Sequence, residues 1–412
     1  MGKSDKVDRY LPLIYLAKWI ALASLVALSA GSASAFFLFA LDWATLTRIA
    51  HRDLILLLPF AGFTVGWLYL HFGQTVEAGN NLLIDEIHDP KSVIPLRMAP
   101  LVLAGTLVSH LFGASVGREG TAVQMGGALA DQFTHIFKLK HEDRRILLMA
   151  GISAGFASVF GTPLAGAIFG LEVLAVGRLR FDSLLPCLLA AIIADQVGLL
   201  WGVHHTHYHI NAIPHFTLTL LLAIIVSGCL FGLAGRSFAG ATHQLSALMK
   251  SKVAYAPLRP FLGGIVIVCV AYCLPVDQYL GLGIPGIVNA FQQPVAVVDF
   301  AAKGLLTVAS LGSGFKGGEV TPLFYIGATL GNALAPILNL PFAFLAGIGF
   351  VAVFAGAANT PIASTLMAVE LFGAEIGVYA AVACVMSYLF SGETGIYRAQ
   401  RKSSKKISSI ND

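Results

Sequence analysis

The chain has 412 residues, of which 57% are hydrophobic and only 12% are charged, with a net charge of +4 and a mean hydropathy of +0.78. Soluble domains carry about 25% charged residues, so this composition excludes an ordinary soluble domain and indicates an integral membrane protein. The apolar segments are continuous runs, not alternating ones, which favours an all-α polytopic membrane protein over a β-barrel.

The apolar segments differ too much in length to be uniform membrane crossings. A perpendicular crossing needs about 20 residues, whereas several segments are shorter and interrupted by Gly or Pro. We therefore predict broken and re-entrant helices, whose backbone ends must be satisfied inside the protein. In chain order the segments are 14–41, 54–72, 95–112, 120–137, 146–160, 162–177, 184–202, 216–240, 258–275, 297–311, 320–337, 341–356, 360–373 and 375–390.

Basic residues mark both ends of the chain. The N-terminus begins MGKSDKVDR and the C-terminus ends YRAQRKSSKKISSIND. The positive-inside rule predicts that both termini face the cytoplasm, which requires an even number of complete crossings. Residues 398–412 are the predicted basic cytoplasmic tail.

A glycine break precedes a polar stretch early in the chain. Residues 79–83 read GNNLL, so Asn80 and Asn81 place amide donors directly after Gly79. An ordinary helix cap explains this pattern, and an anion-facing helix start is the alternative. The sequence GLGIPG at 281–286 holds a similar place in the second half of the chain.

One short pattern occurs twice, 200 positions apart. Residues 117–128 read GREGTAVQMGGA and residues 317–328 read GGEVTPLFYIGA, so that a Gly, a Glu and a Thr recur at the same places. A glycine-rich break that opens a helix in both halves of an apolar chain points to the ion site of a transporter. Helix N-termini bind anions through free N–H groups and the positive end of the macrodipole.

A second repeat supports a duplication. Residues 154–172 and 352–370 both contain Thr-Pro and end in Glu, at a shift of 198 positions. We predict a single membrane transport domain, 1–412, made of inverted repeats at about 10–200 and 215–395.

Glu119 is the main candidate for chemistry. A carboxylate inside a membrane is costly unless it is paired, hydrated or protonated. Deprotonated Glu119 would compete with an anion for the helix N–H groups, and protonated Glu119 would release them. The alternative is a helix-terminal Glu that pairs with Arg118 at the interface.

The other candidates also have two explanations each. Glu319 is either a second functional carboxylate or a partner of Lys316. The Thr321 hydroxyl donates to an anion or caps its own helix. Tyr397 is an interfacial aromatic anchor or an inward-pointing donor.

Four histidines in HHTHYH, residues 204–209, raise the alternative of a membrane-embedded metal enzyme. A solvated loop or weak pH sensing is the explanation that we favour, and the chain has no HExxH or serine-elbow pattern. We expect no metal, no cofactor, no enzymatic activity and no nucleic-acid partner.

Taken together, GNN, GREGT, GEVTP, the two TP…E segments and the late tyrosine resemble the CLC family of chloride channels and anion/proton antiporters, over roughly residues 60–397. The chain looks most similar to the fluoride-selective branch. The resemblance implies antiparallel repeats around a central anion site and a homodimer with one pathway per subunit. It also implies that Glu119 is the gating and proton-transfer glutamate, that Tyr397 is the central tyrosine, and that Glu319 and Thr321 lie in the motif that fluoride-type members use for transport.

The chain departs from the chloride-type motifs GSGIP, GREGP and GxFxP. It has Thr121 in place of the second motif's proline and Val320 in place of the third motif's phenylalanine, as fluoride-handling members do. Glu172 is followed by Val173, where chloride/proton antiporters of the family carry the inner proton acceptor. A chloride-type proton route is therefore in doubt.

We predict a fluoride/proton antiporter that lowers cytoplasmic fluoride, in the lipid of a bacterial inner membrane. The alternatives are a chloride/proton antiporter and a passive anion channel of the same fold. Glu119 and Glu319 are the predicted carboxylates. The predicted anion-binding residues are Gly79, Asn80, Asn81, Gly117, Arg118, Gly120, Thr121, Val320, Thr321 and Tyr397.

Overall fold

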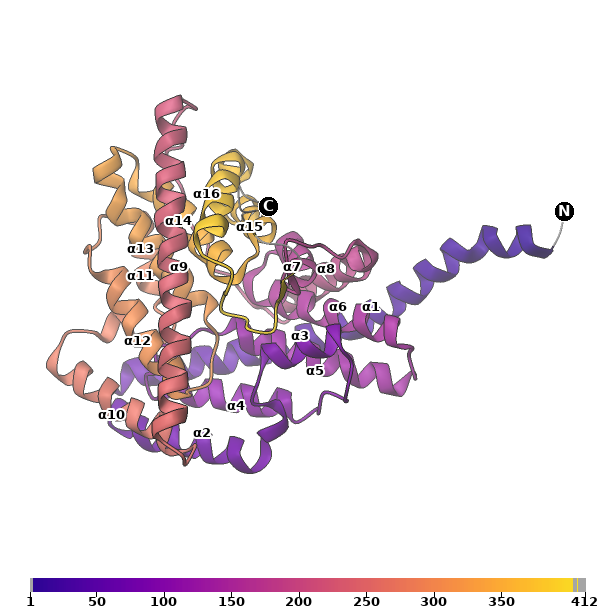
Figure 1. Cartoon of the computed structure of the whole chain (residues 1–412), viewed down its shortest axis with the longest axis horizontal. Helices are drawn as coiled ribbons and strands as arrows, with labels where there is room; N and C mark the ends of the chain where they lie inside the picture. Colours follow the sequence, from indigo (N-terminus) through magenta and orange to yellow (C-terminus); the bar gives the residue numbers. More distant parts are fainter. Residues whose placement is uncertain (1–2, 403–405, 407–412) are drawn as a thin grey trace, which may run out of the picture.

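The computed structural model describes residues 3–402 and 406, with side chains from residue 12 onward, and this part of the chain is mainly helical (Figure 1). The helices are α1 (Lys3–Ala50), α2 (Leu58–Phe72), α3 (Asn80–His88), α4 (Met98–Leu111), α5 (Glu119–Ile136), α6 (His141–Phe160), α7 (Pro163–Glu172), α8 (Leu184–Leu200), α9 (Leu218–Lys252), α10 (Leu258–Cys273), α11 (Ile284–Gln292), α12 (Asp299–Ser313), α13 (Val320–Leu338), α14 (Phe342–Ala358), α15 (Pro361–Phe372) and α16 (Gly377–Phe390). Two short strands, β1 (Ala175–Val176) and β2 (Arg401–Lys402), pair in parallel.

The helices have the mixed lengths that the sequence predicts. By length and composition, five helical stretches in the described residues can cross a membrane, and they are Pro12–Ala50, Arg52–Phe72, Phe181–Leu200, Leu218–Lys252 and Val320–Leu338. Other apolar helices are shorter, such as α7 with 10 residues and α15 with 12. At 1.5 Å per residue these two span only about 15–18 Å, roughly half of a hydrocarbon core.

Some boundaries differ from the predicted segments. Helix α1 continues to Ala50 and α9 to Lys252, because a helix that leaves the apolar layer keeps its own backbone hydrogen bonds. Two short helices outside the predicted apolar segments, α3 and α11, begin directly after Gly79 and Gly283. Each has nine residues, which is shorter than the roughly 11–18 residues over which a hydrophobic period is usually assessed.

The two short helices α7 and α15 cap each other. Glu370, in α15, accepts the backbone N–H groups of Leu164 and Ala165, both at 2.8 Å. Glu172, in α7, accepts those of Ile362 at 3.0 Å and Ala363 at 2.8 Å. Each carboxylate therefore satisfies orphan donors at the other helix's positive end. The two copies of the second sequence repeat are therefore in direct contact.

Close glycine contacts hold the central helices together. A Cβ added to Gly126 in α5 would lie 2.2 Å from the carbonyl oxygen of Gly151 in α6. In the second half, a Cβ on Gly327 in α13 would lie 2.1 Å from the carbonyl oxygen of Gly349 in α14. Small residues let backbones approach where lipid offers no hydrophobic drive. The glycines of the chain thus allow its central helices to pack closely.

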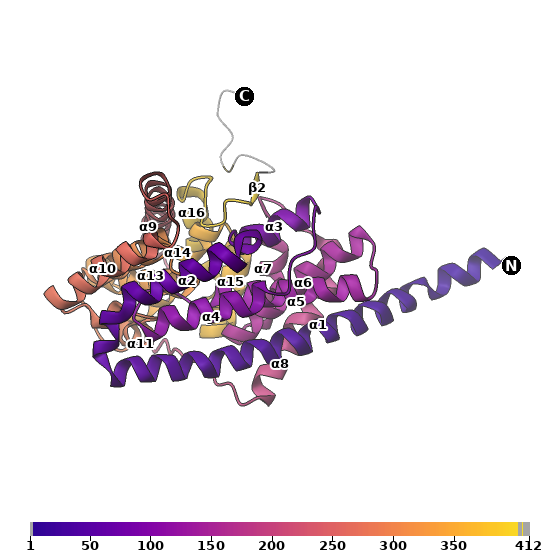
Figure 2. The same cartoon turned by 90° about the horizontal axis from the view of Figure 1, so that it is seen from below.

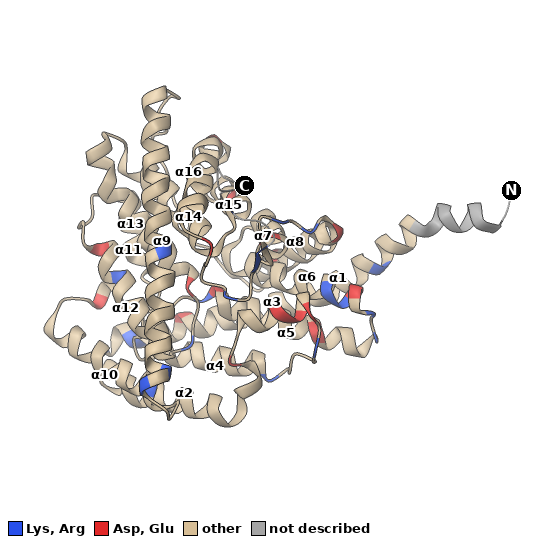
Figure 3. Cartoon of the chain, in the orientation of Figure 1, with Lys and Arg blue, Asp and Glu red and all other residues tan. Residues whose placement is uncertain are grey.

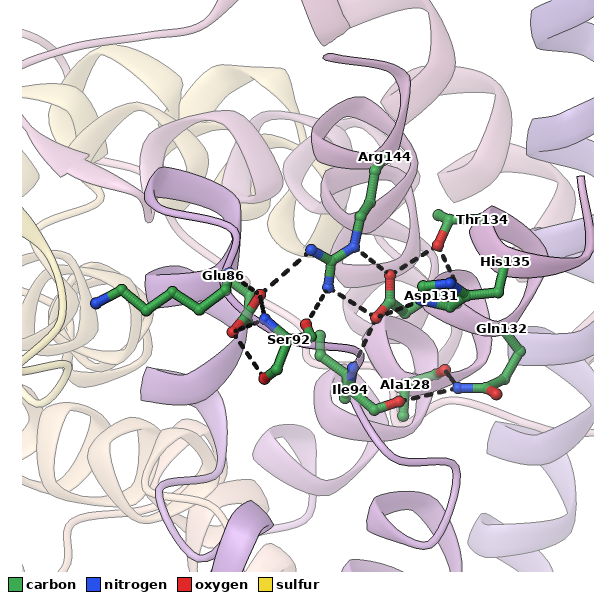
Figure 4. A network of polar contacts seen from close by, with 10 residues as sticks. Glu86, Ser92, Ile94, Ala128, Asp131, Gln132, Thr134, His135 and Arg144 are labelled. Carbon is green, nitrogen blue, oxygen red and sulfur yellow. Dashed lines mark hydrogen bonds and ion pairs between the residues drawn. The ribbon is translucent and has the colours of Figure 1, made fainter. Parts of the chain in front are cut away.

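A buried ionic network joins α3, α5 and α6 (Figure 4). Arg144 donates from Nε to Asp131 Oδ1 at 2.7 Å and from one terminal nitrogen to Glu86 Oε2 at 3.2 Å. Its other terminal nitrogen donates to the Ser92 carbonyl at 2.7 Å, and the Ile94 N–H donates to Asp131 Oδ2 at 2.7 Å. Three charged side chains are thus satisfied away from water, as buried charges must be.

Charged side chains are sparse on the long helices and gather around α3, the start of α6 and the connecting segments (Figure 3). When the molecule is turned, α3 and β2 lie toward one side and α8 reaches the opposite side (Figure 2). Residues 398–402, predicted as the start of a tail, are packed into the fold through β2 and through the Ala399 N–H, which donates to Asn81 Oδ1 at 2.9 Å. Most of the remaining tail, and the first residues of the chain, lie outside the described residues.

Candidate functional site

The two repeated loops meet back to back. The Gly117 N–H donates to the Gly318 carbonyl at 2.6 Å, and the Gly318 N–H donates to the Gly117 carbonyl at 2.8 Å. Helices α5 and α13 begin directly after this bridge, at Glu119 and Val320. Two positive helix ends from opposite halves of the chain therefore converge on one place.

The Glu119 carboxylate occupies this convergence point. Its side chain is 1% exposed, and Oε2 accepts the backbone N–H of Arg118 and that of Thr321, each at 3.1 Å. The Thr321 hydroxyl donates to Oε1. A carboxylate thus fills a nest of N–H and O–H donors of the kind that holds an anion.

The predicted alternative for Glu119, an ion pair with Arg118 at the interface, holds only in part. Arg118 Nε lies 3.7 Å from Glu119 Oε1, but both side chains are largely buried, at 15% and 1% exposed. Because the shorter contacts are those to N–H and O–H donors, the ion pair is a secondary interaction.

A small cavity of about 30 Å³ opens beside Glu119. Arg118, Glu119 and Thr321 line it together with His205 and Tyr208. The two residues of the HHTHYH segment are partly buried, whereas His204, His207 and His209 are exposed. Sequence reasoning missed His205 and Tyr208, since nothing in a loop sequence says which helix ends it covers.

A larger cavity of about 250 Å³ adjoins the same loops and is lined by Gly79, Asn80, Asn81, Gly317, Glu319 and Tyr397, among others. It shares no residue with the smaller cavity. Since Arg118, Glu119 and Thr321 line one cavity and Gly317 and Glu319 line the other, the repeated loops stand between the two.

The two asparagines at the start of α3 make different contacts. Gly79 has a φ of 60°, a left-handed conformation that favours glycine. Asn81 Oδ1 is engaged with the Ala399 N–H. Asn80 lies against α5, since its Nδ2 is 3.1 Å from where a Cβ on Gly120 would be. Its buried Oδ1 has no hydrogen-bond partner among the described residues.

Glu319 and Lys316 do not form the ion pair that the sequence allowed. Within the described residues no salt bridge joins them, and Lys316 Nζ lies 4.0 Å from the centre of the Tyr69 ring instead. Glu319 is the residue before α13 and is partly buried at the larger cavity. The pairing alternative for Glu319 is therefore wrong.

Two further predicted residues, Thr121 and Val320, are buried close to the bridge. The Thr121 hydroxyl hydrogen-bonds to the Thr106 hydroxyl at 2.7 Å, which ties α5 to α4. Val320 is 1% exposed and opens α13. Their side chains support the helix starts, and neither lines the two cavities described above.

Tyr397 is not an interfacial anchor. It is 5% exposed, packs edge-on against Phe169 with ring centres 6.4 Å apart, and lines the larger cavity with Asn80 and Glu319. The anchor alternative is wrong, because the chain after α16 folds back into the protein before it reaches β2.

The described residues contain no group of three or more His, Cys, Asp or Glu side chains that could hold a metal ion. The metal alternative for HHTHYH therefore finds no geometric support in this part of the chain. The groups that converge at the two loops are hydrogen-bond donors and carboxylates.

Comparison with known proteins indicates the family of this chain. A family model described as voltage gated chloride channel matches residues 61–392. The chain is 64% identical, over 97% of its length and 90% of the relative, to a "Chloride/fluoride channel protein" from Pseudomonas syringae pv. tomato. It is 28% identical, over 85% of its length and 81% of the relative, to an "H(+)/Cl(-) exchange transporter ClcA" from Vibrio vulnificus.

Among solved structures, one described as a CLC-type fluoride/proton antiporter superposes with a TM-score of 0.91 at 35% identity, covering 94% of this chain and 98% of the other. The resemblance inferred from the motifs is thereby confirmed, as is the all-α polytopic membrane fold. From its motifs, its helix arrangement and these matches, the chain belongs to the CLC family of chloride channels and related ion-transport proteins.

Proposed function

We propose that this protein exports fluoride in exchange for protons and so lowers cytoplasmic fluoride. The observation that carries the proposal is the Glu119 carboxylate, which accepts N–H groups at the meeting point of α5 and α13. The carboxylate stands where a transported anion would bind. Protonated Glu119 no longer needs those donors, so proton uptake and anion entry are linked at one group.

The choice of fluoride rests on the relatives and on the donors. A relative that is 64% identical carries chloride/fluoride in its name, and a structure at 35% identity is described as a fluoride/proton antiporter. Fluoride is small and strongly hydrated, so a dry site must replace its water with short, strong donors. The amide of Asn80, the hydroxyl of Thr321 and the helix-end N–H groups are donors of that kind.

Proton exchange suits the chemistry of this ion. Fluoride enters cells as neutral HF and dissociates inside, so export coupled to proton entry reverses the trapping. In our proposal Glu119 carries the proton at the smaller cavity, and Glu319, which lines the larger one, is the second carboxylate. The position after Glu172 is Val173, which is 2% exposed and has no proton to exchange.

We place the protein in a bacterial inner membrane with both termini cytoplasmic, as a homodimer with one pathway per subunit. The inverted repeats at about 10–200 and 215–395 form one transport domain. The reciprocal caps of Glu172 and Glu370 and the Gly117–Gly318 bridge support this repeat arrangement.

Chloride/proton exchange is the second candidate function. It is favoured by the 28% identical relative, whose name describes H⁺/Cl⁻ exchange, and by the word chloride in the name of the 64% identical relative. The absence of a carboxylate at Val173 argues against a chloride-type proton route.

The test is ion efflux from proteoliposomes, recorded with a fluoride electrode and an internal pH dye together. Vesicles loaded with fluoride should release it and become acidic inside, whereas vesicles loaded with chloride should do so much more slowly. Fluoride release without a proton flux would indicate a passive channel. Equal or faster chloride exchange would favour the second candidate.

A further inference from the structure

A basic cavity lies away from the anion site, at the face that carries α3 and β2. Its volume is about 590 Å³, within the range of ligand pockets in proteins. Its lining includes five Arg or Lys side chains and one carboxylate, Asp182. The basic residues, with one histidine, are His88, Arg145, Arg178, Arg180, Arg401 and Lys402.

The cavity is assembled from distant segments of the chain. Strand β2 pairs with β1, which places Arg401 opposite Ala175. The Leu174 carbonyl accepts both the Arg401 N–H at 3.1 Å and His88 Nε2–H at 2.8 Å. The cluster of positive charge is therefore fixed by backbone structure and is not a chance gathering of loose side chains.

The positive charge of the cavity is only partly neutralised. Arg180 pairs with Asp182 at 2.9 Å and Lys402 with Glu393 at 2.9 Å. In the described part of the chain, Arg178 and Arg401 have no carboxylate within ion-pair distance. Within the same part, the buried Arg145 Nε–H has no hydrogen-bond acceptor.

Neighbouring charges also act on the histidine at the end of α3. Burial lowers the pKa of His88. The hydrogen bond to the Leu174 carbonyl acts in the opposite direction, and the positive charges of Arg401, Arg145 and Arg180 add to the lowering. Three guanidinium groups thus lie near enough to His88 to disfavour a further positive charge there, and all three line the same cavity. Such a cluster is stabilised by an anion with several oxygens, because guanidinium groups bind phosphate oxygens in pairs.

Apolar side chains adjoin the basic ones at this edge. Phe181, which lines the cavity, is 70% exposed, and Leu184, at the start of membrane helix α8, is 36% exposed. The Tyr15 hydroxyl donates to the Asp182 carbonyl at 3.4 Å, which brings α1 to the same place. A charged recess beside exposed apolar helix ends matches a lipid, with its headgroup in the recess and its chains along the helices.

We propose that this cavity binds the phosphate headgroup of an anionic phospholipid, with the two phosphates of cardiolipin as its best fit. The site is independent of the proposed transport chemistry, since none of its lining residues lines either cavity at the anion site. It gives the protein a specific lipid partner in addition to the bulk membrane.

The test is native mass spectrometry of the full-length protein in detergent, with added cardiolipin or phosphatidylcholine. We expect wild-type protein to retain cardiolipin in preference to phosphatidylcholine. The Arg178→Gln/Arg401→Gln double variant should retain roughly thirty-fold less cardiolipin, because each basic group near a membrane surface contributes about five-fold in affinity. Arg178→Lys/Arg401→Lys should keep most of it.

Lys91→Gln/Lys140→Gln is the matched control, since both lysines are exposed and neither lines the cavity. Cardiolipin retention that falls equally in this control, or that stays unchanged in the Arg→Gln variant, would overturn the proposal. Inorganic pyrophosphate is the soluble probe. If pyrophosphate binds to wild-type protein through Arg178 and Arg401 while cardiolipin shows no preference over phosphatidylcholine, the site takes a soluble phosphate and the lipid assignment is wrong.

Discussion

Glu119 and Thr321 come from opposite halves of the chain, and the backbone N–H of Thr321 donates to Glu119 Oε2 at 3.1 Å. The Thr321 hydroxyl reaches the other oxygen of the same carboxylate. One half of the protein thus supplies the charge, and the other half supplies two of the donors that hold it. In the proposed exchange, we therefore expect a change at this contact to act on the binding of a proton and on the access of an anion together.

Thr321→Val removes the hydroxyl donor and keeps the shape of the side chain. A hydrogen bond to a charged group contributes about 1.5–3 kcal/mol and favours the deprotonated carboxylate. Without it the charge of Glu119 loses one of its donors, so proton-coupled fluoride efflux should fall by roughly ten-fold or more relative to wild type. Thr321→Ser, which keeps the hydroxyl, should resemble wild type. Equal proton-coupled fluoride efflux in the Val and Ser variants would refute the role of the hydroxyl.

Asn80→Ser and Asn81→Ser should have different effects. Asn80 lies against Gly120 at the start of α5, and we expect its shorter replacement to weaken the preference for fluoride over chloride. Asn81 holds the Ala399 N–H, so its replacement should loosen the C-terminal segment and leave selectivity near wild type. Paired efflux assays and limited proteolysis measure the two effects. A selectivity loss confined to Asn81→Ser would reverse the assignment.

Much of this site follows from the sequence, because a carboxylate in a glycine break leaves a local pattern that repeats. The 200-position spacing pointed to Glu119 and Thr321, and the structure brings them into contact. His205 and Tyr208 could not be predicted, since a loop has no period and its place over the smaller cavity depends on tertiary packing. The same limit applies to the choice between Asn80 and Asn81.

For the fold as well, the sequence predicts some features and leaves others open. Long apolar helices such as α13 are recognisable from their hydrophobic runs, whereas α3 and α11 are marked in the sequence only by the glycines at their starts, in GNN and GLGIPG. Glu172 and Glu370 were recognised as partners in a repeat. That each caps the helix of the other could not be seen, because the contact depends on how the two halves face each other.

Arg144→Gln should destabilise the protein by about 3–5 kcal/mol, because it leaves the buried carboxylate of Asp131 without its partner. Arg145→Gln is the matched control on the neighbouring residue. Arg145 makes only a 3.5 Å contact to Glu142, whose side chain is 74% exposed, so its loss should cost less than about 1 kcal/mol. Unfolding of the purified variants in detergent measures both. Similar losses for the two variants would contradict a structural role for the α3–α5–α6 network.

Gly327→Ala should lower stability or prevent folding, since its Cβ would meet the Gly349 carbonyl oxygen at 2.1 Å. Overpacking of this kind costs about 1–3 kcal/mol or more. Gly240→Ala offers the comparison, because a Cβ there meets no atom within 4 Å in the described structure and alanine favours the helix by up to about 1 kcal/mol. Thermal unfolding should separate the two variants. A tolerated alanine at position 327 would mean that α13 and α14 are less closely packed than described.

In the proposed exchange, Glu119 couples the proton to the anion. The most direct measurement of this coupling is the simultaneous recording of fluoride efflux and internal pH in proteoliposomes that contain Glu119→Gln, with the exposed Glu375→Gln as control. We predict that Glu119→Gln abolishes the proton flux that accompanies fluoride, while Glu375→Gln behaves as wild type. Fluoride efflux from the Glu119→Gln vesicles that acidifies their interior at the wild-type rate would contradict the account.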